Sequence, residues 1–508
     1  MSAEPKSSSS SENATGPSEL ESGKSPLAVA NDVESKPEDP NVVDWDGPDD
    51  PQNPHNWTSG KRWTHIGIVS LLALVTNMAP TMCAPGIGDI AAELGITSSV
   101  VSTLAITLYV LGLGIGPMLI SPLSEVYGRL PVYHACDIAF VVLLIGNALV
   151  RNAAGFIVLR FLSGFVGGTP QALGGGTIAD VTILANRANA MSLFSLGPLL
   201  GPVLGPLIGG FVTEGLGWPW IFWLLAIFGG ASTVAAIVFL RETNPKILLE
   251  RKAARLRATT GNPALRSALT HPHSISPKQV LAGALGRPAK LLVKSPILLI
   301  MSLYVAFIFG TTYLLFTTFP DVFEGQYGFT VATSGLAYLG LGVALFVALI
   351  INRTYGEPVR QARMKADGVT QPRPEYRLIF MICFSPFVGF GLFIYGWTAQ
   401  NRVHWIVPII GTFVIGIGAF FVLVPSQLYL VDLFGSAGAA SALGANNLTR
   451  FLASTFLPLA GPRLYATLGY GWGNTLLGFL ALAFVPAPVL FYKYGERLRA
   501  MTDAKVLK

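Results

Sequence analysis

The chain has 508 residues, of which 51% are hydrophobic and only 12% are charged. Soluble domains carry about 25% charged residues, so this composition excludes a soluble protein, and the three cysteines, scattered through apolar runs, exclude a disulfide framework. The net charge of +6 hides an asymmetry, because residues 1–60 hold 12 of the 28 acids and 3 of the 34 bases.

Residues 1–60 are rich in Ser, Pro, Glu and Asp and contain no apolar run. A stretch of this kind cannot bury enough surface to offset the entropy lost on ordering. We therefore expect a disordered acidic cytosolic tail. Its start has neither the basic region nor the apolar region of a signal peptide.

Twelve apolar runs follow, each close to the roughly 20 residues that cross about 30 Å of hydrocarbon. Lipid offers no hydrogen-bond partners, and a barrel would show short alternating segments, so these runs predict helices. The fold class is therefore an all-α membrane protein with twelve transmembrane helices in two six-helix bundles. The predicted spans are 64–84, 99–121, 132–150, 155–179, 190–213, 219–240, 297–319, 332–352, 377–398, 404–425, 439–461 and 473–493.

The layout predicts an N-terminal bundle at 61–240, a basic linker at 241–296, a C-terminal bundle at 297–494 and a short tail at 495–508. With the N-terminus inside, 29 Lys and Arg residues fall in cytosolic segments and three in outer loops. Positive charge is retained on the cytosolic side, so both termini and the linker should be cytosolic. Residues 246–257 predict either a basic helix on anionic headgroups or a solvated connection.

The second span ends in a loop that carries charged residues and a turn signal. Glu125 and Arg129 are four residues apart and would pair if the helix persisted, whereas Gly128 and Pro131 favour a turn into the next span. From the residues alone this is an ordinary ion pair at a helix end.

Two charged residues lie inside predicted spans of the first bundle. Arg160 is a few residues into the fourth span, where an arginine costs about 2.5 kcal/mol or more unless it faces a polar cavity or a partner. It has a functional role or reaches the outer interface. Asp137, six residues after Pro131, is either a titratable site or an interfacial residue.

Glycine and proline recur every four residues in the fifth span. Four residues advance a helix by about 400°, so the glycines form one flat stripe, while the prolines remove backbone donors. A neighbouring helix can rock against such a stripe, and plain close packing explains it equally well. The residues are Gly197, Pro198, Gly201, Pro202, Gly205, Pro206, Gly209 and Gly210.

Aromatic residues crowd the seventh span, and polar residues occupy successive turns of the eleventh. An aromatic wall suits planar or cationic organic ligands, although packing or lipid-facing aromatics are commoner. The residues that we expect to line a substrate cavity are Gln171, Tyr304, Phe307, Tyr313, Asn446, Asn447 and Arg450.

Together these motifs resemble the major facilitator superfamily, and within it the fungal twelve-span drug:proton antiporters, over residues 43–497. Residues 122–131 resemble the family's loop signature, with Ser121, Glu125 and Leu130 replacing its Gly, Asp and Lys, as in the fungal branch. In that family the loop acid and Arg129 form a charge relay with an acid at the end of the fourth helix, matched by Asp180, and the cluster latches the two bundles. The loop at 353–377 holds only a degenerate copy.

The resemblance also assigns roles to the other motifs. Residues 201–210 are similar to the antiporter signature of the fifth helix, which favours export. Arg160 corresponds to an arginine implicated in proton transfer, whereas Asp137 falls on a helix that packs outside the central cavity in that family. Residues 43–57 and 241–245 are similar to the fungal preamble and to the marker after the sixth span.

These features lead us to expect a proton-coupled exporter of small hydrophobic or cationic organic molecules, such as drugs, fungicides or secondary metabolites, at the plasma membrane. The alternative is proton-linked movement of one metabolite, such as a polyamine, organic acid or siderophore. The six histidines are scattered, so we expect neither an enzyme nor a metal site, and no nucleotide-binding loop is present. The expected partners are a small-molecule substrate, protons and the bilayer, with no nucleic acid and no cofactor beyond the proton gradient, and the chain should be monomeric.

Overall fold

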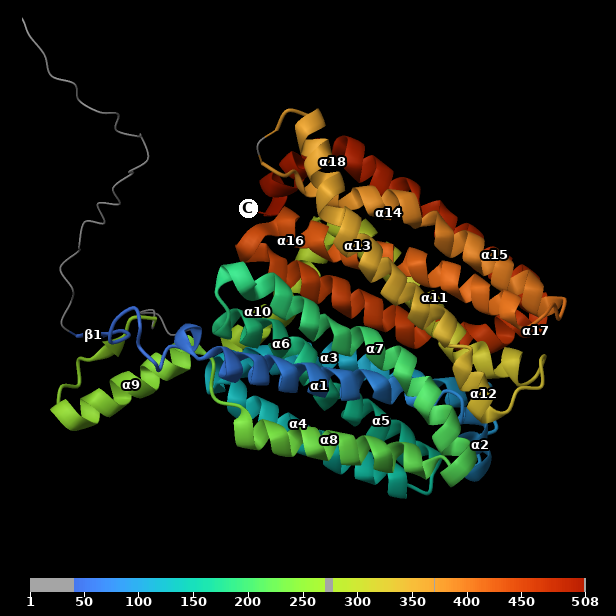
Figure 1. Ribbon diagram of the computed structural model, residues 1–508, viewed down its shortest axis with the longest axis horizontal. Coiled ribbons are helices and arrows are strands. Elements are labelled where there is room, and N and C mark those ends of the chain that lie inside the picture. The colour runs from blue at the N-terminus through green and yellow to red at the C-terminus, as the bar shows by residue number, and fades with distance from the viewer. Residues whose placement is uncertain (1–40, 270–276, 370, 507–508) are drawn as a thin grey trace, which may run out of the picture.

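The computed structural model describes residues 41–269, 277–369 and 371–506, which are largely helical (Figure 1). In these ranges eleven helical stretches are long and apolar enough to cross a bilayer. The last of them, Gly438–Arg499, has 62 residues and reverses direction at Gly469, where φ is +70°. The hydroxyl of Tyr465 donates to Oδ1 of Asn474 at 3.1 Å, although nine residues of straight helix would separate them by about 13 Å. The stretch therefore crosses twice, and the predicted all-α fold with twelve crossings is confirmed.

The first bundle contains six crossings, whose ends lie within a few residues of the predicted spans. Its fourth crossing consists of two short helices that meet at Gly168, and a short helix, α2 (Ile87–Glu93), follows the first crossing. The helices that cross are α1 (Ser59–Met82), α3 (Ser99–Tyr127), α4 (Arg129–Leu149), α5 (Ala153–Gly167) with α6 (Thr169–Val181), α7 (Leu184–Leu216) and α8 (Pro219–Phe239).

The second bundle repeats this plan. A glycine at position 435, with φ of +58°, separates the tenth and eleventh crossings within α16, and short 3-10 segments occur at Pro374–Arg377 and Leu457–Ala460. Its helices are α11 (Pro296–Phe323), α12 (Val331–Leu336) with α13 (Leu339–Ala366), α14 (Leu378–Phe384) with α15 (Pro386–Gln400), α16 (Ile406–Phe456), α17 (Gly461–Phe484) and α18 (Pro486–Val506). The helix α18 continues to Val506, so the described part of the predicted tail at 495–508 is helical.

The two bundles lie side by side, with the linker at one end and α2 and α12 at the other (Figure 1). We call these the linker end and the far end. In the far half, the backbone N–H of Ala332 on α12 donates to Glu214 of α7 at 2.7 Å. The hydroxyl of Thr455 on α16 donates to the carbonyl of Thr107 on α3 at 3.4 Å. The bundles are therefore held together in their far halves.

Residues 41–58 are ordered, in contrast to the predicted disordered tail, whose residues 1–40 lie outside the described ranges. Strand β1 (Val42–Val43) pairs in parallel with β2 (Arg266–Ser267) of the linker, and a 3-10 turn occupies Pro54–Asn56. Hydropathy could not reveal this segment, because it contains no apolar run and only single apolar residues, such as Val43 and Trp57, are buried beside its polar contacts.

Those contacts surround a single lysine of the linker helix α9 (Pro245–Thr260). Lys252 is 6% exposed, and its ammonium donates to the Asp44 carbonyl at 2.8 Å and to Asp46 at 2.6 Å. A hydrogen bond from the backbone N–H of Asp46 lowers the pKa of Asp50, and Lys252 lowers it further. Charge-assisted hydrogen bonds therefore hold the preamble, residues 43–57, against the linker.

The linker contains a second helix, α10 (Pro277–Lys294), which packs against α3 and α16 at the linker end. The first linker helix, α9, projects away from the bundles together with β1 (Figure 1). Its Leu249 and Ala253 are buried, whereas Lys246, Arg251 and Arg255 are exposed. The exposed basic residues fit both sequence interpretations, so the choice between a solvated connection and a helix on headgroups stays open.

Candidate functional site

The glycine stripe of α7 faces α1. A Cβ placed on Gly201 would lie 2.6 Å from the Cβ of Asn77, and one placed on Gly205 would lie 2.8 Å from the carbonyl oxygen of Met78. The prolines of the stripe remain inside one continuous helix. The stripe therefore allows two backbones to approach closely, which is the packing interpretation.

The far end of the same helix contacts the second bundle. A Cβ on Gly210 would lie 2.6 Å from the carbonyl oxygen of Val331, and one on Gly335 would lie 2.5 Å from that of Pro206. Gly210 is therefore turned toward α12, whereas Gly209 is turned toward Met82 of α1. Because α7 packs closely on a helix of each bundle, it is placed where one bundle could turn against the other.

We expect the Gly201→Leu variant to have a lower melting temperature than the wild-type protein. The added side chain would overlap Asn77, and overpacking of this kind costs about 1–3 kcal/mol. The matched control is Gly230→Ala on α8, where an added Cβ meets nothing within 4 Å. Thermal unfolding of the purified proteins is the measurement, and equal melting temperatures for all three would contradict the packing described here.

A charge cluster joins two helices of the first bundle to the start of the linker, at the linker end. Nε of Arg129 donates to Asp180 at 2.5 Å, and the hydroxyl of Thr243 donates to the same carboxylate at 3.2 Å. The side chains of Arg129 and Asp180 are 17% and 13% exposed, so solvent screens the pair only weakly. The start of α4 is thereby fixed to the end of α6 and to the start of the linker.

Glu242 completes this cluster and was not predicted from the sequence. Its carboxylate accepts from the backbone N–H groups of Arg129 at 3.0 Å and Leu130 at 3.2 Å, at the N-terminus of α4. A carboxylate at this position satisfies free helical N–H groups and opposes the helix dipole. Gly128 makes this contact possible, because its φ of +98° and the closeness of Glu242 leave no room for a Cβ.

The expected pairing of Glu125 with Arg129 is wrong. The helix α3 ends at Tyr127, so the two residues lie on different helices and the four-residue spacing no longer applies. Glu125 is exposed, and within the described residues no ion pair is found for it. The cluster of Gly128, Arg129 and Asp180 lies entirely in the first bundle, and its role as a latch between bundles stays a prediction.

The second bundle holds a counterpart that sequence reasoning missed. Nε of Arg377, at the start of the ninth crossing, donates to Asp432, at the end of the tenth, at 2.9 Å. The spacing between the partners is 55 residues, against 51 in the first bundle. This similar spacing is a sequence feature that could have indicated the pair of Arg377 and Asp432. The degenerate signature at 353–377 could not indicate the pair, because Asp432 lies outside that loop.

Arg160 is fully buried in the far half of the first bundle. Its guanidinium donates to the carbonyls of Ala79 and Ala105 at 3.0 Å and of Pro80 at 3.3 Å, and lies 4.8 Å from the ring centre of Tyr109. Ala79 and Pro80 belong to the last turn of α1, where carbonyls lack helical partners. The arginine therefore binds the negative end of a helix, and it does not reach the outer interface.

Pro80 leaves one more backbone carbonyl of α1 without a helical hydrogen-bond donor. Its missing N–H frees the carbonyl of Thr76 four residues earlier, and the hydroxyl of Tyr109 donates to that oxygen at 2.7 Å. Arg160 and Tyr109 together satisfy the backbone around this proline.

Asp137 and Gln171 occupy different surroundings. Asp137 is 4% exposed on α4, which packs against α8 and α5, and within the described residues its Oδ2 has no hydrogen-bond partner. Nε2 of Gln171 donates to Oδ1 of Asn77 at 2.6 Å, joining α6 to α1. Gln171 thus meets the helix that carries the glycine contact, whereas Asp137 lies away from the second bundle.

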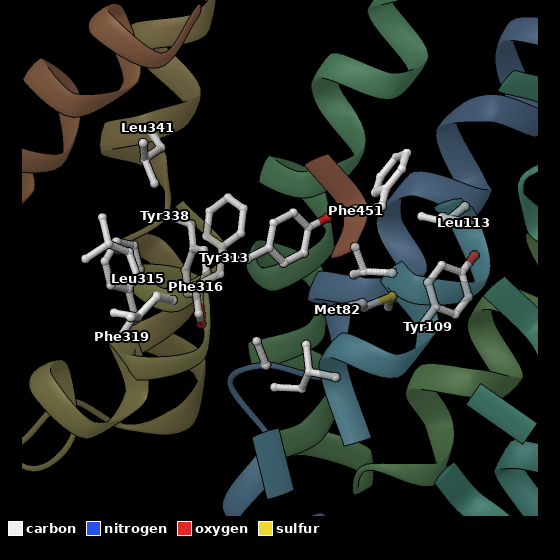
Figure 2. Packing of buried hydrophobic residues seen from close by; sticks show 14 of the residues in the cluster. Met82, Tyr109, Leu113, Tyr313, Leu315, Phe316, Phe319, Tyr338, Leu341 and Phe451 are labelled. Atoms are coloured by element: carbon white, nitrogen blue, oxygen red, sulfur yellow. The ribbon is translucent and has the colours of Figure 1, made fainter. Parts of the chain in front are cut away.

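The aromatic residues of α11 divide between two faces. Tyr304 stacks on Phe484 with ring centres 5.1 Å apart, and Phe307 lies 5.7 Å from the same ring. Both residues therefore pack within the second bundle, and their place in a substrate cavity stays a prediction. Tyr313 lies on the opposite face, because nine residues turn a helix through about 180°, and Figure 2 shows it directed toward Phe451 and the first bundle.

Arg450 lies beside Tyr313, near the contact between the bundles. Its guanidinium is 4.6 Å from the ring centres of both Phe309 and Phe451, and Phe451 packs against Gly114 of α3. Asn446 and Asn447 lie on the preceding turn of α16, and within the described residues their Oδ1 atoms have no partner. The structure therefore brings Tyr313, Arg450 and the asparagines together, apart from Tyr304 and Phe307.

A family profile and the similar proteins in fungi indicate the same family. The Major Facilitator Superfamily profile matches residues 69–458. The chain is 53% identical over 470 residues to the MFS transporter prlG of Fungal sp., covering 92% of this chain and 98% of that one. It is 46% identical over 480 residues to the trichosetin biosynthesis cluster MFS transporter of Gibberella fujikuroi, covering 94% and 93%. It is 41% identical over 472 residues to the efflux pump radE of Floropilus chiversii, covering 93% and 87%.

Solved structures share the fold. The xylose transporter XylE from E. coli, in a partially occluded inward-open conformation, matches with a TM-score of 0.62. The identity is 15%, and the match covers 86% of this chain and 98% of that one. At this identity the likeness supports the arrangement of helices and carries nothing about the ligand.

Proposed function

The chain belongs to the major facilitator superfamily of membrane transporters, and from this premise we propose that it exports small apolar organic compounds in exchange for protons. The observation that carries the direction is the glycine and proline stripe of α7, which is similar to the antiporter signature and packs between α1 and α12. Relatives named as an efflux pump and as a transporter of a biosynthesis cluster support export of a secondary metabolite or toxic compound.

The contacts between the bundles suggest how the cycle proceeds. We take the linker end as cytosolic, as the distribution of Lys and Arg indicates, with both termini on that side of the plasma membrane. Glu214 and Thr107 then hold the outer halves of the bundles together, which corresponds to an inward-facing state. Opening outward requires breaking these contacts while α7 turns against its neighbours.

Proton coupling requires a group that gains and loses a proton inside the membrane. Arginine stays charged in proteins, so Arg160 would act through its field. In the described residues Asp137 is one of the few buried carboxyl groups, 4% exposed, and it lies about 12 Å from the start of α4. We assign the proton to Asp137 and the electrostatic role to Arg160, with no cofactor other than the gradient and with a monomer as the working unit.

The alternative is uptake of a specific metabolite. Cells that lack the protein should distinguish the two, because loss of an exporter raises retention of the compound and loss of an importer lowers it. We expect a null strain to be sensitised to at least one apolar toxic compound and to retain several-fold more of it. Restoring the wild-type gene is the control, and unchanged sensitivity across a chemically diverse panel would contradict export.

A further inference from the structure

Among the described residues no ion-pair partner is found for Arg450, which lies near the middle of its crossing. It lies 12 residues after Gly438, the start of its crossing, which is about 18 Å of helix. The residue is 8% exposed, and its Nε has no hydrogen-bond partner within the described ranges. A buried guanidinium is costly unless it is paired or reaches water, so this arrangement requires an explanation.

Arg160 of the first bundle shows how a fully buried guanidinium is satisfied by the protein itself. Arg160 donates to three backbone carbonyls, which use its hydrogen-bonding capacity and fix its position. Arg450 has no such set, and two aromatic rings, Phe309 and Phe451, flank it instead. Rings stabilise the charge without using its N–H donors. The donors of Arg450 are therefore left for another molecule.

Two asparagines precede Arg450 on α16, and Nδ2 of Asn446 donates to the hydroxyl of Ser302 at 3.5 Å. The Oδ1 atoms of Asn446 and Asn447 are buried without partners in the described part of the chain, three and four residues before Arg450. Amide oxygen and nitrogen positions are interchangeable by rotation, so these side chains could also donate to an anion. Tyr313 adds a hydroxyl directed toward the first bundle.

The described carboxylates of the second bundle do not neutralise this charge. They lie at the far end or the linker end of the crossings, remote from the middle of α16. These residues are Asp321, Glu324, Glu357, Asp367, Glu375, Asp432 and Glu496. A cationic ligand beside Arg450 would therefore meet repulsion with no compensating acid, whereas an anion would be attracted.

We propose that the transported compound is an organic anion, with a carboxylate on an apolar body, and that Arg450 binds its charge while Phe309 and Phe451 contact the body. This inference rests on the proposed function and narrows its ligand. Arginine matches the planar, bidentate geometry of such oxyanions. Export of an anion is also favoured by an inside-negative membrane potential.

The test is equilibrium binding to the full-length protein in nanodiscs, with empty nanodiscs subtracted. The probes are dansylaminoundecanoic acid, its primary amide and the amine of the same chain length, which differ in charge and share an apolar body. We expect the acid to bind at least tenfold more tightly than the amide, and the amine to bind most weakly. An amide or amine that binds as tightly as the acid, or an acid that does not bind above background, would overturn the proposal.

Variants of Arg450 test whether this residue causes the preference for the acid. Arg450→Gln should weaken binding of the acid about tenfold and leave the amide unchanged, while Arg450→Lys should retain most of the preference. Arg402→Gln, which removes an exposed arginine at the far end, is the matched control. An unchanged acid affinity in Arg450→Gln would refute the assignment, and the ranking of probes on the wild-type protein decides the matter if that variant does not fold.

This binding assay separates the inference from the proposed function. Preference for the acid without any export in the null-strain assay would leave the inference standing and remove export. Normal export in the null-strain assay, without preference for the acid in the binding assay, would support export and refute the inference.

Discussion

Replacement of Arg160 by alanine is expected to abolish transport. The change removes a fully buried guanidinium and leaves the carbonyls of Ala79, Pro80 and Ala105 without their donor. Each buried acceptor left unpaired costs about 1–3 kcal/mol, which is large beside a typical stability of about 5–15 kcal/mol. Export of the compound found in the null-strain screen is the measurement, together with the melting temperature of the purified variant.

The conservative variant Arg160→Lys separates structure from coupling. An ammonium keeps the charge and three donors but cannot span the carbonyls of α1 and α3 in one plane. We expect it to fold, to exchange compound across the membrane and to respond less to a pH gradient. Wild-type transport in Arg160→Ala would remove the arginine from the mechanism.

Replacement of Asp180 by asparagine is expected to reduce transport at least tenfold. Arg129 would remain in a site where its side chain is only 17% exposed, with no carboxylate beside its guanidinium, since Glu242 accepts from backbone N–H groups. Charge-assisted hydrogen bonds in such surroundings contribute about 1.5–3 kcal/mol. The initial rate of export at equal protein abundance is the measurement.

Two comparisons make this result specific. Arg151→Gln breaks an exposed pair with Glu93, whose side chains are 81% and 48% exposed, and such pairs contribute little. That variant should transport normally. The double variant Arg129→Gln, Asp180→Asn should be no worse than the single variants, because the two residues act as a unit. Additive losses would show that they act separately.

Hydropathy located the crossings well because the bilayer imposes one requirement on all of them. The predicted span 219–240 corresponds to Pro219–Phe239, and 297–319 lies inside Pro296–Phe323. The same uniform apolar composition hides which face of each helix is turned toward the other bundle, because a helix that is apolar all round has no periodic hydrophobic pattern. Tyr304 and Tyr313 therefore received one role from the sequence, although they face opposite sides of α11.

Polar contacts between segments far apart in the sequence were the other feature that the sequence could not predict well. Lys252 meets Asp46 across 206 residues, and Arg129 meets Asp180 across 51. The resemblance to a known family supplied the second pairing, whereas nothing in the local sequence indicated the first. For Glu125 the condition set by the sequence is not met, because pairing with Arg129 required a continuous helix and α3 ends at Tyr127, before Gly128.

The central claim is that a proton gradient drives export, and inside-out membrane vesicles test it most directly. The lumen of such a vesicle corresponds to the outside of the cell, so acidifying it should drive accumulation of the compound found in the null-strain screen. A proton ionophore should abolish this accumulation, and Asp137→Asn should lose it while retaining exchange of labelled for unlabelled compound. Accumulation that persists at full rate after the gradient is collapsed would contradict proton coupling.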